Sequence, residues 1–395
     1  MSSVYESNIW KFYLFKIVSA MELTISIFVL FLLANKLSMT QVMTLETIFI
    51  AIVLLLEVPS GAFADLFGRK ISLSLAMLCA SISFVIFGIG ADYWTFLAAQ
   101  IFIAFGWALT SGADSALLYD SLKEAGSERG YARIFGRGNF YSLLTFAISA
   151  LFSGFLAVYL GYRALFFITS FIFFAGFIVC LLFKEPPIHK IIHEKNYLKH
   201  LAKAIRFSYS NKTVKNLIIY FGMFAALGHL SWFLIQPFYE QSELPGYTVG
   251  IATFLYFITA ALGNLTAERF IRRIKEERLL IIILLIASLS FIGIFFVNRL
   301  FALLLISIMS FVCGVRDILV NKGINEHTDS HHRATVVSIQ SMSKSLMYAI
   351  FAPLIGYFTD LFSPSAAFLM MGIGLFLFFV YYLVLSLANR KSPAL

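Results

Sequence analysis

The sequence predicts an all-α polytopic membrane protein with about twelve spanning helices in two six-helix bundles. Of its 395 residues, 60% are hydrophobic and only 13% are charged, and the mean hydropathy is +0.87. Soluble domains carry about 25% charged and about 45–50% apolar residues, so the composition excludes both a soluble enzyme and a disordered chain. Since a spanning helix needs roughly 20 residues, the length accommodates about a dozen helices and one longer loop.

Apolar runs separated by polar breaks place the individual segments. In the first half we expect helices at 9–34, 41–62, 71–90, 94–118, 137–160 and 163–183. In the second half we expect helices at 215–239, 247–267, 278–297, 300–320, 336–358 and 364–388. The first run continues without a small-residue cleavage site, so it is interpreted as a spanning helix and not as a signal peptide. The predicted domains are an N-terminal bundle (1–183), a basic cytoplasmic linker (184–213) and a C-terminal bundle (214–395).

The distribution of positive charge predicts the orientation. With both termini in the cytoplasm, only Lys36, Arg163 and Arg299 fall on outer loops, and about 25 of the 30 basic residues face the inside, as the positive-inside rule requires. The net charge of +9 therefore reflects topology. Because the basic residues form no continuous stripe, we expect no nucleic-acid partner. The expected location is the inner (plasma) membrane, where the chain crosses the lipid bilayer as a monomer.

The two halves resemble distant copies of each other. The helix at 94–118 ends in Ser111-Gly112-Ala113-Asp114, and about 200 residues later the helix at 300–320 ends in Cys313-Gly314-Val315-Arg316-Asp317. Two six-helix halves related by an axis along the membrane normal are a transporter architecture. We therefore expect the halves to rock as bodies around a substrate site near the midplane, between the helices at 9–34, 94–118, 215–239 and 300–320.

The sharpest motif lies between the second and third predicted helices, at residues 57–70. Gly61 and Gly68 are expected to allow close helix approach and a tight turn. Asp65, Arg69 and Lys70 place both signs of charge at the inner edge of the membrane. This loop resembles the signature of the major facilitator superfamily, in which Gly, Asp, Gly, Arg and a final Arg or Lys occur at these spacings. The resemblance implies the fold of that superfamily and transport by alternating access.

A second resemblance concerns residues 111–122 and the following loop, which are similar to a bacterial branch of small-molecule and drug exporters. It implies that Asp120 is the partner of Arg69 and that the pair belongs to an inner gate. The alternative is that Asp120 is a solvated helix end. The chain departs from the drug–proton antiporter pattern, because 100–106 contains no arginine and 149–154 contains no proline.

Titratable groups within the apolar segments are candidates for substrate and proton handling. A charge at the bilayer centre costs roughly 2.5–3.5 kcal/mol, so such groups usually face a cavity and have a function. Glu22 lies in the middle of the first segment and His229 in the middle of the seventh, at nearly the same depth. We expect Glu22 to couple transport to protons. His229 has a second interpretation, since a histidine near Trp232 can simply pack within the bundle.

A further polar set lies in the fourth, tenth and eleventh segments. Asp114 is the half-repeat counterpart of Arg316 and Asp317, and Lys344 lies in the eleventh segment. Asp114 and Arg316 could pair across the two halves, either as a gate or anion-binding group or as a static salt bridge. Two further polar residues could line the same cavity: Gln236 and Asn264.

The remaining motifs give no sign of a cofactor, a metal site or an enzyme. The sequence contains no phosphate-binding loop, zinc-protease motif or serine elbow. We therefore predict a secondary active transporter that moves a small organic molecule by alternating access, with proton-coupled export as the expected direction. The alternatives are a metabolite importer of the same fold, as a symporter or uniporter, and an integral-membrane enzyme that acts on lipid.

Overall fold

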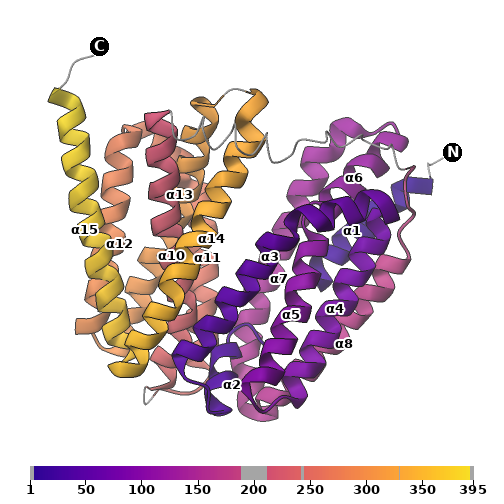
Figure 1. Cartoon of the computed structure of the whole chain (residues 1–395), viewed down its shortest axis with the longest axis horizontal. Helices are drawn as coiled ribbons and strands as arrows, with labels where there is room; N and C mark the ends of the chain where they lie inside the picture. The colour runs from indigo at the N-terminus through magenta and orange to yellow at the C-terminus, as the bar shows by residue number, and fades with distance from the viewer. Residues whose placement is uncertain (1–3, 188–210, 242–243, 329, 392–395) are drawn as a thin grey trace. The chain divides into compact units, whose positions relative to one another are not determined.

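In the computed structural model the described residues are 4–187, 211–241, 244–328 and 330–391. They form helices joined by short turns, and the described ranges contain no strand (Figure 1). The chain divides into two compact units, Met1–His193 with Pro245–Ile251, and Glu194–Leu244 with Ala252–Leu395. Most of the basic linker predicted at 184–213 lies outside the described residues, which resume at 211.

The first unit is built from eight described α-helices and two short 3-10 turns, Val4–Glu6 and Glu128–Gly130. The α-helices are α1 Ser7–Val18, α2 Phe28–Ala34, α3 Met39–Phe67, α4 Arg69–Ile89, α5 Tyr93–Thr110, α6 Ala113–Glu124, α7 Tyr131–Leu160 and α8 Tyr162–Leu181. The second unit contains α10 Lys212–Glu240, α11 Thr248–Arg273 apart from its first residues to Ile251, α12 Glu276–Phe296, α13 Arg299–Glu326, α14 Ser330–Leu361 and α15 Pro364–Lys391.

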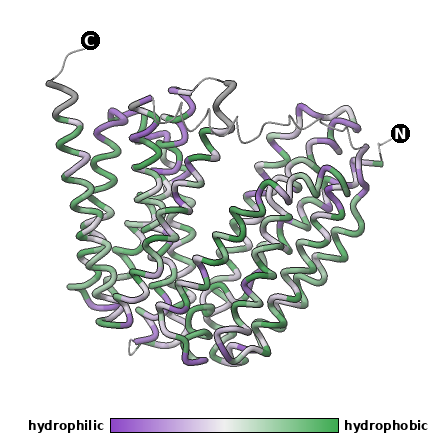
Figure 2. The backbone as a smooth tube through the Cα atoms, in the orientation of Figure 1, coloured by the Kyte–Doolittle hydropathy of each residue, from purple (hydrophilic) through white to green (hydrophobic). Residues whose placement is uncertain are grey.

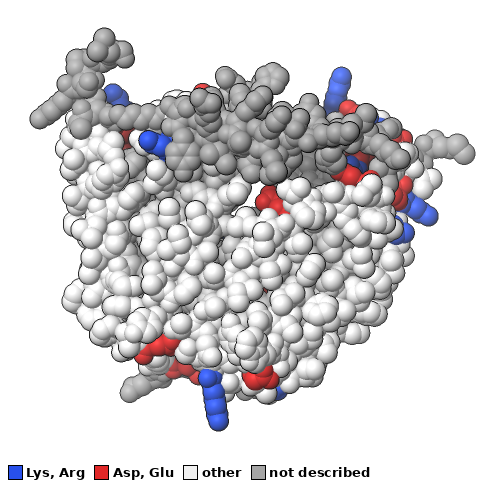
Figure 3. All heavy atoms as spheres, viewed as in Figure 1, with Lys and Arg blue, Asp and Glu red and all other residues white. Residues whose placement is uncertain are grey.

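The predicted all-α membrane fold is confirmed, and each of the twelve predicted segments corresponds to a helix or a helix pair. Ten helices in the described part of the chain are long and apolar enough to cross a membrane. Hydrophobic residues run along them and hydrophilic residues gather at their ends (Figure 2). In the view of Figure 3, charged side chains lie near the two ends of the helices and the walls between are almost uncharged. Such walls suit a hydrocarbon surrounding, in which every exposed charge is costly.

Two predicted helices are interrupted. The segment expected at 9–34 is found as α1 and α2, separated by non-helical residues 19–27. The segment expected at 94–118 is found as α5 and α6, because Gly112 adopts a φ of +76° that breaks the helix. A residue with a side chain rarely adopts this conformation, so the glycine explains the position of the second break.

Helix α4 packs between α5 and α8 in the first unit, and α12 packs between α13 and α15 in the second. Small buried residues on α4 permit this packing, including Ala76 and Ala80. An aromatic cluster closes one end of the first unit: the Phe166 ring lies 4.3 Å from that of Phe31 and 5.6 Å from that of Phe87. The buried aromatic surface fixes α2, α4 and α8 around the interrupted first segment.

Candidate functional site

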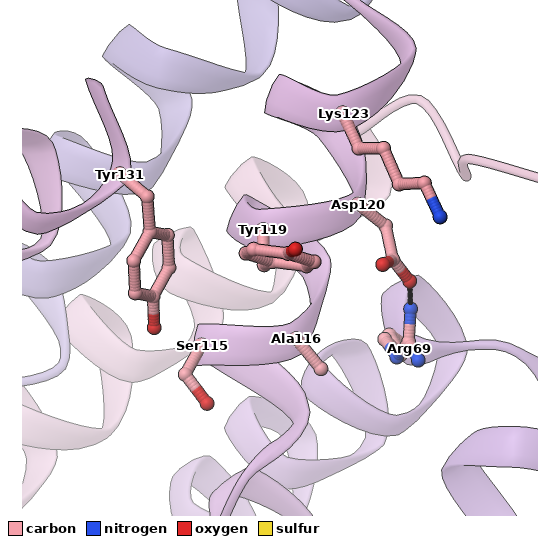
Figure 4. Close-up of a pocket in the computed structure, with 7 residues that line it drawn as sticks. All are labelled: Arg69, Ser115, Ala116, Tyr119, Asp120, Lys123 and Tyr131. Atoms are coloured by element: carbon pink, nitrogen blue, oxygen red, sulfur yellow. Dashed lines mark ion pairs between the residues drawn. The ribbon is translucent and has the colours of Figure 1, made fainter. Parts of the chain in front are cut away.

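A pocket of about 450 Å³ opens at the end of the first unit where α4 begins. Figure 4 shows its lining side chains: Arg69, Ser115, Ala116, Tyr119, Asp120, Lys123 and Tyr131. Most of them come from α6, and the rings of Tyr119 and Tyr131 meet edge to face at 5.5 Å. The pocket therefore combines two cations, one carboxylate and an aromatic wall within a single unit.

The Arg69 guanidinium forms an ion pair with the Asp120 carboxylate, drawn as the dashed line in Figure 4. The side chains are 15% and 19% exposed, so the pair is only weakly screened by solvent. Asp65, one turn before Arg69, lies 3.9 Å from the same guanidinium. The structure thus brings together three of the charged residues that the sequence singled out, from α3, α4 and α6.

Gly68 and Glu185 define the start of α4. Gly68 has a φ of +105°, and a Cβ at this position would lie 3.1 Å from the Glu185 carboxylate carbon. That carboxylate accepts hydrogen bonds from the backbone N–H groups of Arg69 and Lys70, at 2.8 and 2.7 Å. A negative charge at a helix N-terminus satisfies free donors and interacts favourably with the helix dipole. Glu185 was not among the predicted site residues, because it lies in the predicted linker, far in sequence from the motif that it caps.

The close helix approach expected at Gly61 is not found within its own unit. Among the described residues of that unit, no atom lies within 4 Å of a Cβ built at Gly61. Gly61 lies inside α3, which continues to Phe67, and the turn of the motif is made at Gly68 alone. The expectation of a tight turn is confirmed at Gly68.

Polar contacts tie α1 to the same end of the unit. The Asn8 side chain donates to the Ser121 hydroxyl and to the Lys184 carbonyl, both at 2.8 Å. Its amide oxygen accepts a hydrogen bond from the Lys184 backbone N–H at 3.0 Å. These bonds connect α1, α6 and the residues after α8. This end of the first unit is consequently held by a network larger than the motif itself.

Asp114 has a partner on α1. Its carboxylate lies 2.6 Å from the Lys16 ammonium group, and both side chains are largely buried. The sequence left open a pair between Asp114 and Arg316, whereas in the structure Arg316 pairs with Asp317 at 2.7 Å. Each of these charges therefore already has a partner within its own unit.

Glu22 lies in the interruption between α1 and α2. Its carboxylate accepts a hydrogen bond from the Thr24 hydroxyl at 3.1 Å. Side chains of neighbouring helices satisfy backbone groups that the break leaves free: the Thr169 hydroxyl accepts from the Leu23 N–H at 3.2 Å. The Ser26 hydroxyl in turn donates to the Ala150 carbonyl at 2.7 Å. Non-helical backbone at membrane depth requires such support, and it is typical of transporter binding sites.

A second carboxylate lies close to Glu22. Glu46 on α3 is 8% exposed, and its Oε1 accepts a hydrogen bond from the Gln100 side chain at 2.6 Å. Glu22 and Glu46 repel each other electrostatically. Glu46 was not among the predicted site residues, although the charge cost that singles out Glu22 applies equally to a glutamate in the apolar run at 41–62. Two buried carboxyl groups that influence each other in this way can hold a proton and release it when their surroundings change.

His229 packs among aromatic rings of the second unit. Its ring centroid lies 5.0 Å from that of Tyr348, 5.7 Å from that of Phe233 and 5.9 Å from that of Trp232. It also interacts electrostatically with Lys344. The packing and the charge together place His229 at the edge of a cationic cluster.

That cluster is centred on Arg316 of α13, which is 5% exposed. Its Nε and Nη2 donate to Asp317 Oδ1 at 3.1 and 2.7 Å. Lys344 of α14 interacts electrostatically with both residues. The structure therefore brings Arg316, Asp317 and Lys344 together within the second unit.

The two predicted polar residues of α10 and α11 differ in their surroundings. Gln236 on α10 is fully buried. Asn264 on α11 is half-buried, and its Oδ1 has no hydrogen-bond partner within the described residues. The side chain of Asn264 therefore retains an acceptor.

Comparison with known proteins identifies the class to which this fold and these motifs belong. The sequence profile of the Major Facilitator Superfamily matches residues 12–247 and 216–394, so the chain belongs to this family of membrane transporters. It is 24% identical over 381 residues to YxaM of Bacillus subtilis (strain 168), an uncharacterised MFS-type transporter, with 92% of each chain covered.

Solved structures share the fold. The nucleoside transporter NupG superposes with a TM-score of 0.80 at 12% identity, covering 95% of this chain and 98% of that one. A bacterial homologue of the human lysosomal transporter Spinster, inward-facing and occupied, superposes with a TM-score of 0.77 at 16% identity, covering both chains fully. At these identities the likeness establishes the fold alone. The chain is thus a multi-pass membrane transporter of the superfamily.

Proposed function

We propose that the chain is a proton-coupled secondary transporter that exports a small organic molecule by alternating access. The observation that supports the coupling is the interruption between α1 and α2, which contains Glu22, a carboxylate that interacts electrostatically with the buried Glu46. Two repelling carboxylates in a low-dielectric site bind a proton readily and release it when their surroundings become wetter. Export is supported by the resemblance of residues 111–122 to the exporter branch.

The Arg69–Asp120 pair and the Glu185 cap form the inner gate in this proposal. Asp65 and Asp120 compete for one guanidinium, so a small movement of α3 relative to α6 changes which carboxylate it contacts. Paired charges that form in one conformation and separate in another bias a two-state equilibrium. The inner gate is therefore expected to stabilise one state of the transport cycle.

The proposed orientation places both termini and the gate in the cytoplasm of a cell whose plasma membrane the chain crosses. The support is the excess of lysine and arginine on the corresponding loops, with about 25 of 30 basic residues on one side. We further propose that the transporter acts as a monomer, since each unit forms its own compact body.

The coupling is tested in proteoliposomes loaded with a pH-sensitive dye. A counterflow screen with a panel of small organic molecules first identifies a transported probe. The panel includes nucleosides, because NupG is a nucleoside transporter. We expect addition of that probe to drive proton movement in the wild type. Glu22→Gln is expected to abolish proton movement while counterflow of the probe continues, because exchange needs the binding site but no net proton transfer.

Glu6→Gln provides the control. Glu6 lies in the 3-10 turn before α1, outside the apolar segments, and its side chain is exposed, so this variant is expected to retain proton movement. Unchanged proton movement in Glu22→Gln would remove Glu22 from the coupling mechanism. Counterflow without proton movement in the wild type would contradict proton coupling as a whole.

A further inference from the structure

The cationic cluster of the second unit, defined as Arg316, Lys344 and their partner Asp317, carries two positive charges and one negative charge. Within the described residues of this unit, Asp317 is the acidic side chain that interacts electrostatically with Arg316 and Lys344. Two other carboxylates of the unit pair elsewhere, Glu276 with Lys322 and Glu268 with Arg272. Within the cluster itself one positive charge is therefore left uncompensated.

Arg316 is oriented so that part of its guanidinium can still bind a ligand. Asp317 accepts hydrogen bonds from Nε and Nη2, whereas the hydrogen bond of Nη1 within the described residues goes to the weak acceptor Cys313 Sγ, at 3.7 Å. The guanidinium carbon lies 4.7 Å from the ring centroid of Phe224, which holds it in place through a cation–π contact. A guanidinium with a free N–H edge is suited to a carboxylate or another oxyanion.

The backbone of α10 lies close to Arg316 at Gly228. A Cβ built at Gly228 would lie 3.6 Å from Arg316 Nη1 and 3.2 Å from Cys313 Sγ. The glycine thus lets the free edge of Arg316 approach α10, the helix that also carries His229. Lys344, half-buried on α14, adds its charge from the next helix.

We infer that Arg316 and Lys344 bind the anionic group of the transported molecule, so the substrate class is an organic anion. This inference rests on the proposed transport function for the claim that the ligand is a substrate. Its physical basis is charge balance: a surplus buried cation is costly alone and is stabilised when an anion enters. The aromatic rings around His229 provide an apolar wall for the body of that anion.

Binding of radiolabelled benzoate to the purified full-length chain tests the inference, with benzamide as an uncharged competitor of the same shape. We expect unlabelled benzoate, but not benzamide, to displace the label. Lys344→Gln is expected to weaken binding by about tenfold or more, and Lys344→Arg to restore it. Lys322→Gln is the matched control, because Lys322 lies on α13 in a partly exposed ion pair with Glu276.

Asp317→Asn separates this inference from simple loss of folding. The substitution raises the charge of the cluster from +1 to +2, so benzoate should bind about threefold tighter or more. A misfolded variant cannot bind more tightly. Equal displacement by benzoate and benzamide, or no saturable benzoate binding in either the wild type or Asp317→Asn, would overturn the inference. Retained benzoate binding with no proton movement would contradict the proposed coupling and leave the anion site standing.

Discussion

Gly68 satisfies two requirements that a residue with a side chain cannot meet together. Its φ of +105° is accessible to glycine, and the Glu185 carboxylate occupies the space that a Cβ would need. We expect Gly68→Ala to destabilise the protein by about 1–3 kcal/mol, the usual range for a residue held in a sparsely populated conformation. The melting temperature of the purified protein measures this loss.

Gly61→Ala is the matched control for that substitution, and its expected effect has the opposite sign. Gly61 lies in the interior of α3 with open space around its Cα, so alanine removes flexibility without a clash. We expect Gly61→Ala to raise the free energy of unfolding by about 0.5–1 kcal/mol. Equal losses at the two positions would show that the turn at Gly68 has no special role.

The Arg69–Asp120 ion pair gives a second prediction at this scale. Since both side chains are largely buried, removing one leaves the other charge poorly solvated. Arg69→Gln and Asp120→Asn should each lower the free energy of unfolding. The double variant should lose less than the sum of the two single losses, and the difference, the coupling free energy, should be about 1–3 kcal/mol. Thermal unfolding of the four proteins measures the cycle. Lys123→Gln, at the exposed side of the same pocket, should change stability by less than about 0.5 kcal/mol.

At the scale of elements, the non-helical residues 19–27 depend on the helices that surround them. Ser153 on α7 accepts a hydrogen bond from the Ser26 N–H, and Thr169 on α8 accepts one from the Leu23 N–H. Removing an acceptor leaves a buried donor unsatisfied, which costs about 1–3 kcal/mol. We expect Thr169→Val combined with Ser153→Ala to increase amide hydrogen exchange in residues 19–27.

Ser149→Ala serves as the control for this exchange experiment. Ser149 is buried on the same face of α7, one turn before Ser153, so both substitutions remove a similar hydroxyl. Exchange in residues 19–27 should match that of the wild type in Ser149→Ala. Unaltered exchange in the double variant would mean that the interruption is stable without these side chains.

The sequence could predict the helices but not their interruptions. Residues 19–27 mix apolar residues with Ser19, Glu22, Thr24 and Ser26, and the apolar run resumes after them, so hydropathy alone does not mark the break beside Glu22. The break depends on acceptors from Thr169 and Ser153, which lie more than a hundred residues away. A tertiary cause of this kind is invisible to a local pattern. The break at Gly112 differs, because the glycine itself was a local signal.

The candidate site residues divide in the same way, into those that a local sequence pattern predicts and those that depend on the fold. The charged motif at 57–70 is local, and its residues could be found from spacing alone. The contribution of Glu185 could not, since a helix cap supplied from a distant segment depends on the fold. Glu46 differs from Glu185, because the sequence alone shows it within an apolar run. The high cost of a charge inside the bilayer, which singled out Glu22, would have singled out Glu46 as well.

At the scale of the whole molecule, the charges of the helix ends determine how the chain lies in the membrane. Loops rich in lysine and arginine stay on the cytoplasmic side, because moving them across the bilayer is unfavourable. The loop at 90–92 contains no basic residue, whereas the segment at 119–137 carries Lys123, Arg129, Arg133 and Arg137. The two loops are consequently expected on opposite sides of the membrane.

Single-cysteine variants measure that topology. In a chain whose three native cysteines are replaced by alanine, Ala91→Cys and Ser127→Cys each introduce one thiol at an exposed position. A membrane-impermeant maleimide added to intact cells should label position 91 and spare position 127, and permeabilised cells should label both. The reverse pattern would place the Arg69–Asp120 pair outside the cell, where it could not serve as a cytoplasmic gate. Because the positive-inside rule acts on every loop together, labelling at these two positions tests the orientation of the entire chain.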